Sequence, residues 1–76
     1  MLKPQEVIDK YYLETRCMLL ESAAMLDRYQ ASVKREGSTA SDESKLEVLR
    51  EAFSILARDD RSDDRTKQLL ELFARV

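Results

Sequence analysis

The sequence contains no histidine, and this absence weighs against most metal and acid–base chemistry. Histidine is the commonest transition-metal ligand and the side chain that most often moves protons near neutral pH. The single cysteine, Cys17, has no second cysteine to bridge to and no histidine to activate its thiol. We therefore expect Cys17 to be a small buried apolar side chain, and we expect neither a catalytic residue nor a cofactor.

A chain of 76 residues also has few ways of stabilising its fold. A domain of this size buries only about 60–65% of the surface that its unfolded chain exposes. Small domains commonly add disulfides, metal ions or oligomerisation, and the composition argues against the first two. Self-association, in its simplest form a homodimer, is the expected source of the missing stability.

The sequence has little net charge and no long apolar run. It carries 13 basic and 15 acidic side chains, a net charge of -2, so it lacks the positive field that holds nucleic acid or anionic lipid. No apolar run exceeds four residues, so neither a signal peptide nor a membrane-spanning segment is expected. Together with the unpaired cysteine, this favours a cytoplasmic protein.

Proline and glycine each occur once, and they bracket one long helical pattern. Pro4 suits the first turn of a helix, and Gly37 suits the left-handed position just after a helix end. Between them, apolar and small residues recur at alternating steps of four and three, as in a coiled-coil heptad. We call this set the seam: Ile8, Tyr12, Thr15, Leu19, Ser22, Leu26, Tyr29 and Val33. The sequence predicts a helix over about 4–35 and a loop over 36–42.

Residues 43–58 have the pattern of a second, core-facing helix. Apolar side chains recur at helical spacing and form one broad face: Leu46, Val48, Leu49, Ala52, Phe53, Ile55 and Leu56. Ser41 or Ser44 is the expected N-cap, and the sequence from Ser44 to Glu47 matches a capping box.

Residues 58–68 contain no apolar side chain and predict a break. Aspartate and serine in this stretch prefer caps and turns to helix interiors. Ser62 is the expected N-cap of a third helix over about 63–75, and its apolar side chains extend to Val76. The alternative is an unbroken second helix over 43–75, which would make the chain a two-helix antiparallel hairpin.

These patterns predict an all-α fold in a single domain, 1–76. The expected architecture is a three-helix bundle in which the long N-terminal helix packs against the two shorter helices. Dimerisation would then build a larger helical bundle. No internal repeat suggests a different organisation.

The long helix carries more apolar surface than one short partner helix can cover. Tyr11, Met18 and Met25 widen the seam. A second stripe, Leu13, Cys17, Leu20 and Ala24, lies a quarter turn or more away. Either the two shorter helices cover these faces within one protomer, or the helix meets its twin across a two-fold axis. The interface residues expected for the second arrangement are Tyr11, Leu13, Cys17, Met18, Leu20, Ala24 and Met25.

Two groups of acidic residues are weak candidates for metal binding. Asp59, Asp60 and Asp63 match the spacing of the DDxxD motif that holds magnesium and diphosphate. Glu43, Glu47 and Glu51 lie at i, i+4 and i+8, a geometry also found in helical magnesium-dependent nucleotide pyrophosphohydrolases. A solvated turn and a solvated helix face account for both groups more simply, so no metal is expected.

Three functions are compatible with the sequence. The favoured one is a small non-enzymatic helical protein that self-associates or docks a partner helix through residues 4–35. The first alternative is an acidic metal-binding or nucleotide-processing protein that uses one of the two acidic groups. The second is a nucleic-acid-associated regulator, which is disfavoured because Asp63 and Asp64 at the start of the recognition helix would repel phosphate.

Overall fold

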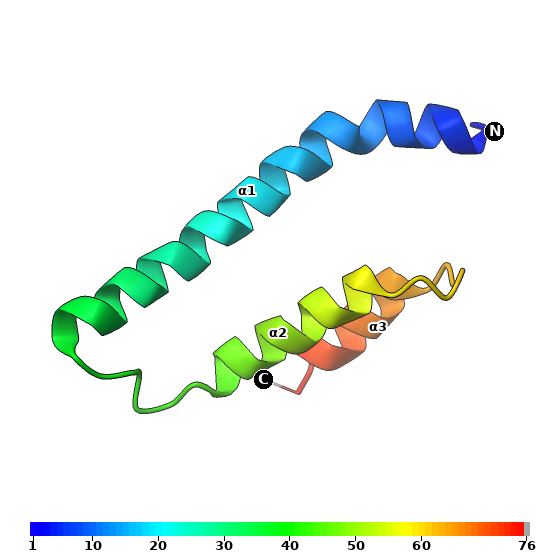
Figure 1. Cartoon of the computed structure of the whole chain (residues 1–76). Helices are drawn as coiled ribbons and strands as arrows, with labels where there is room; N and C mark the ends of the chain where they lie inside the picture. The colour runs from blue at the N-terminus through cyan, green and yellow to red at the C-terminus, as the bar shows by residue number, and fades with distance from the viewer. Residues whose placement is uncertain (76) are drawn as a thin grey trace. The chain divides into compact units, whose positions relative to one another are not determined.

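The computed structural model describes residues 1–75, which form three α-helices and no strand (Figure 1). The helices are α1 (Pro4–Glu36), α2 (Ser44–Ala57) and α3 (Arg65–Phe73). The all-α prediction is confirmed, and the unbroken second helix is wrong because the chain leaves helical geometry between α2 and α3. Val76, which we assigned to the apolar face of the third helix, lies outside the described residues. The chain divides into two units, with the boundary between Thr39 and Ala40.

The helix α1 begins and ends at the two residues that the sequence marks. Pro4 is its first residue, and the backbone N–H of Lys3 donates a hydrogen bond to Glu6 Oε1 at 3.3 Å. Gly37 follows the last residue with a φ of 78°, and its N–H donates to the carbonyl oxygen of Val33 at 2.8 Å. The 33 residues of α1 make a rod of about 50 Å at 1.5 Å per residue.

Replacing Gly37 with alanine should destabilise the end of α1 by about 1 kcal/mol, because an L residue is strained in the left-handed region. A Cβ at this position would meet nothing within 4 Å, so the backbone conformation alone accounts for the loss. Urea unfolding followed by circular dichroism measures it. The control is Gly37→Asn, which tolerates positive φ and should lose less. Equal stability of the alanine variant and the native chain would contradict this role.

The helices α2 and α3 lie side by side and antiparallel, joined by the turn at residues 58–64 (Figure 1). Among residues 1–75, the buried side chains are Ala52 of α2, 5% exposed, and Leu72 of α3, 2% exposed. They belong to the two helices that contact each other in this unit. Near the end of α3, Arg75 Nη2 lies 3.4 Å from Glu51 Oε1 of α2. The core of this unit is therefore small and depends on one fully buried leucine.

Both predicted serine caps are wrong, and for the same physical reason. The N–H of Ser44 donates to Asp42 Oδ1 at 2.9 Å, and the N–H of Ser62 donates to Asp60 Oδ1 at 3.1 Å. An aspartate that bonds the N–H two residues ahead forms an Asx turn. The N–H of each serine is thereby engaged by an aspartate, and neither serine serves as the N-cap. The N-cap residues are Glu43 for α2 and Asp64 for α3.

Candidate helix-docking surface on α1

The surface of α1 is apolar over much of its length. No residue within Pro4–Glu36 is buried. Its large apolar side chains from Val7 to Leu20 are 40–66% exposed: Val7, Ile8, Tyr11, Tyr12, Leu13, Met18, Leu19 and Leu20. Contiguous exposed apolar surface of this kind marks interaction sites in soluble proteins.

All seven predicted interface residues lie on α1, where helical geometry divides them between two sides. Tyr11, Met18 and Met25 border the seam, whereas Leu13, Cys17, Leu20 and Ala24 form the second stripe. The prediction that Cys17 is buried is wrong, because its side chain is exposed.

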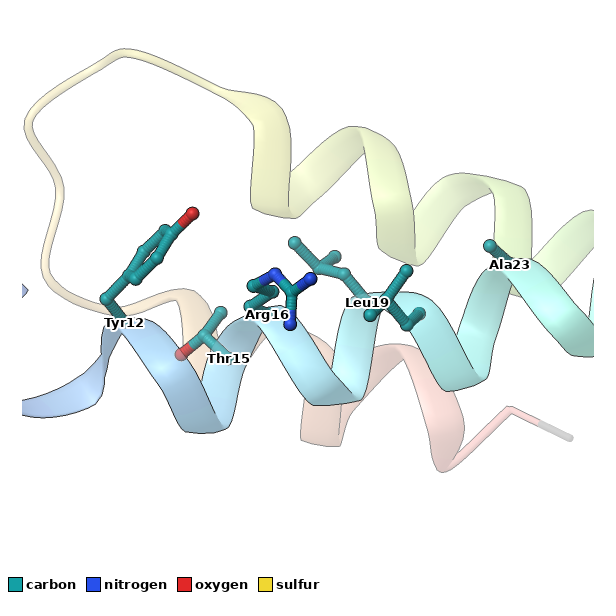
Figure 2. Close-up of a pocket in the computed structure, with 6 residues that line it drawn as sticks. Tyr12, Thr15, Arg16, Leu19 and Ala23 are labelled. Carbon is teal, nitrogen blue, oxygen red and sulfur yellow. The ribbon is translucent and has the colours of Figure 1, made fainter.

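An apolar hollow runs along α1 between the seam and the second stripe (Figure 2). Its lining residues are Tyr12, Thr15, Arg16, Leu19, Leu20 and Ala23. They form two neighbouring rows at i, i+4 and i+8, one from Tyr12 to Leu20 and the other from Thr15 to Ala23. The groove between two such rows is the feature that receives a ridge of side chains from another helix.

Short side chains make this hollow, and our list of expected interface residues did not include them. Thr15 and Ala23 are small next to Leu19, which lies between them in the same row (Figure 2). Our interface prediction named Leu20 but omitted Arg16, Thr15 and Ala23. The i, i+4 rows are visible in the sequence, and comparing side-chain size along them would have located the hollow.

Ser22 is the polar residue at the middle of the seam, and its hydroxyl is satisfied within α1. Ser22 Oγ donates a hydrogen bond to the carbonyl oxygen of Met18 at 3.0 Å. A hydroxyl bonded to its own helix can be covered by apolar side chains without losing its donor interaction. Ser22 is therefore compatible with burial against another helix.

The acidic turn between α2 and α3 is organised by arginines. The Asp60 carboxylate lies 3.9 Å from Arg58 Nη1 and 3.9 Å from Arg65 Nη2. The hydrogen bonds from Ser62, backbone first, together with these guanidinium groups, lower the pKa of Asp60. Arg65 also donates to the carbonyl oxygens of Ser62, at 3.0 Å, and of Arg58. Asp60 thus serves as a partner of the backbone and of two cations within the turn.

Neither acidic group is gathered into a metal-ligand set. Among residues 1–75, no group of three or more cysteine, aspartate or glutamate side chains is placed to hold a metal ion. In the first group, Asp60 is engaged by the turn, whereas Asp59 and Asp63 are exposed. In the second, Glu47 and Glu51 are also exposed, and Glu51 pairs with Arg75 across α2 and α3.

Comparison with known proteins identifies no relative of this chain. No protein-family model matches the sequence, and searches of curated proteins and of solved structures find no match. Over residues 1–75, none of the helices combines the length and apolar character needed to cross a membrane.

Proposed function

We propose that this is a non-enzymatic helical protein that acts by helix-to-helix association through α1, with self-association as its main form. One observation carries the proposal: a helix of 33 residues buries none of them and exposes large apolar side chains from Val7 to Leu20. A helix gains most of its stability in proteins by packing an apolar face. Such a face on α1 is therefore expected to have a partner.

The energies involved are sufficient for association. Burying one leucine or methionine side chain is worth about 1.5–3 kcal/mol relative to leaving it exposed. Association costs about 4–15 kcal/mol of lost translational and rotational freedom. The exposed set on the seam and its flank includes Ile8, Met18 and Leu19, and a pairing of two copies covers such side chains twice. The apolar gain can then exceed the cost.

The non-enzymatic part of the proposal rests on composition. The sequence has no histidine, so Cys17 and the carboxylates have no imidazole partner for proton transfer. The lone cysteine also supports the cytoplasm, where thiols stay reduced, as the place of action.

Sedimentation velocity of the full chain at micromolar concentrations tests the association. We expect a concentration-dependent dimer, and we expect Met18→Glu/Met25→Glu to be monomeric because two carboxylates per helix would have to be desolvated at the contact. The matched control is Glu14→Gln/Glu21→Gln on the polar face of α1, which should still dimerise. A native chain that is monomeric throughout, or a Met18/Met25 variant that associates as tightly as the control, would overturn the proposal.

A further inference from the structure

We propose that α1 pairs antiparallel with α1 of a second copy through the seam, in the register where the numbers of facing residues add to 41. This inference rests on the proposed function and specifies its partner, orientation and contact face. Its first basis is the spacing of the seam, whose steps of 4-3-4-3-4-3-4 read the same from either end. A seam with this symmetry matches itself when one of two helices is reversed.

The residues that meet in this register are complementary in size and chemistry. Four layers form on each side of the two-fold axis: Ile8 with Val33, Tyr12 with Tyr29, Thr15 with Leu26, and Leu19 with Ser22. Aliphatic meets aliphatic, aromatic meets aromatic, and each large leucine meets a small hydroxyl residue. Alternating large and small residues across facing positions lets layers interdigitate. Near the axis, the Ser22 hydroxyl already donates to the Met18 carbonyl oxygen and needs no partner from the other copy.

The flank of the seam that carries the methionines fits the same register. Residues on this flank each come one position before a seam residue, so in the same register neighbouring flank residues have numbers that add to 43. Met18 of one copy therefore lies beside Met25 of the other. Tyr11 lies beside Ser32 by the same arithmetic. Flexible methionine side chains fill irregular space between packed helices. Three of the seven predicted interface residues, Tyr11, Met18 and Met25, thus join the pairing, and the second stripe stays outside it.

The helix dipoles and the packing of the seam favour the antiparallel arrangement. Opposed helix dipoles add a favourable contribution. In a parallel, in-register pair, Thr15 and Ser22 would instead each meet themselves and leave the layers underfilled. The helix dipoles and the packing therefore favour the same orientation.

Disulfide trapping between two single-cysteine chains tests the orientation and register. In a Cys17→Ser background, one chain carries Ile8→Cys and the other carries Val33→Cys. Mixed before mild oxidation at a concentration where the native chain is dimeric, they should give a cross-linked heterodimer on a non-reducing gel. Each variant alone should give none, because in the antiparallel pair two copies of residue 8 are 25 positions apart along the helix, about 37 Å.

The control is Leu20→Cys in the same background. Leu20 belongs to the second stripe, and it would lie close to its own copy if that stripe formed an antiparallel contact. Self-linking of Leu20→Cys, self-linking of the Ile8→Cys or Val33→Cys chain, or a sedimenting dimer without the mixed cross-link would each overturn the proposed pairing while leaving association through α1 intact. A native chain that does not sediment as a dimer would instead overturn both proposals.

Discussion

Leu72→Ala should unfold the α2–α3 unit under conditions where the native chain keeps it folded. Leu72 is 2% exposed, and the other buried side chain among residues 1–75 is Ala52. Replacing a buried leucine with alanine costs about 2–5 kcal/mol, through lost burial and the cavity that remains. The total stability of a small domain is of similar size. A unit with so small a core has little reserve to absorb the loss.

Amide hydrogen exchange is the measurement that isolates this effect, because it reports α2 and α3 separately from α1. We expect protection in residues 44–57 and 65–73 to fall together toward the level of an unfolded chain. Leu70→Ala is the matched control, since Leu70 lies on the same helix and is 66% exposed. Surface substitutions of this kind usually change stability by about 0.5 kcal/mol or less. Equal losses in the two variants would show that Leu72 is not the centre of the core.

Leu19→Glu should abolish the proposed dimer, whereas Leu20→Glu should preserve it. Leu19 belongs to the seam and would face Ser22 of the second copy next to the two-fold axis, so two carboxylates would be placed close together and out of water. Desolvating an unpaired charge costs several kcal/mol, and about 1.4 kcal/mol corresponds to a tenfold change in affinity. The dissociation constant should therefore rise at least about 100-fold.

Leu20 provides a close comparison because the two leucines are neighbours, similarly exposed at 57% and 55%, and both line the hollow on α1. Sedimentation velocity of the two variants over the same concentration range gives the two dissociation constants. If Leu20→Glu lost the dimer and Leu19→Glu kept it, the second stripe would be the surface that meets the partner.

The extent of α1 could be predicted because the determinants are local. Pro4 and Gly37 act through their own backbone geometry, and each lies where its conformational preference requires. The break after α2 could also be predicted, because Asp60 and its neighbours favour turns over helix. What the sequence did not indicate was that the break is held by Arg65, which bonds the carbonyl oxygens of Arg58 and Ser62. The bond to Arg58 joins residues seven apart across a non-helical turn, and the periodicity of apolar side chains does not reveal it.

The N-caps of α2 and α3 were predicted at the wrong residues because serine and aspartate side chains compete there for backbone N–H groups. Ser44 and Ser62 are good capping residues, but Asp42 and Asp60 also bind backbone N–H groups, and the aspartates took the N–H groups of the serines themselves. The same bonds lower the pKa of both carboxyls. The exposure of Cys17 was missed for a different reason, since whether an apolar helix face is covered depends on elements outside the helix.

The position of Gly37 has a consequence for where the paired α1 helices of two copies would end. In the register proposed for the seam, the residue facing Pro4 is Gly37, because their numbers also add to 41. The left-handed conformation of Gly37 stops α1 at that point, so two antiparallel rods would finish flush, with no unpaired helical turn projecting from either end. The chain leading to α2 would leave each rod beside the N-terminus of the other. The length of α1 and the register of its seam thus specify the same alignment.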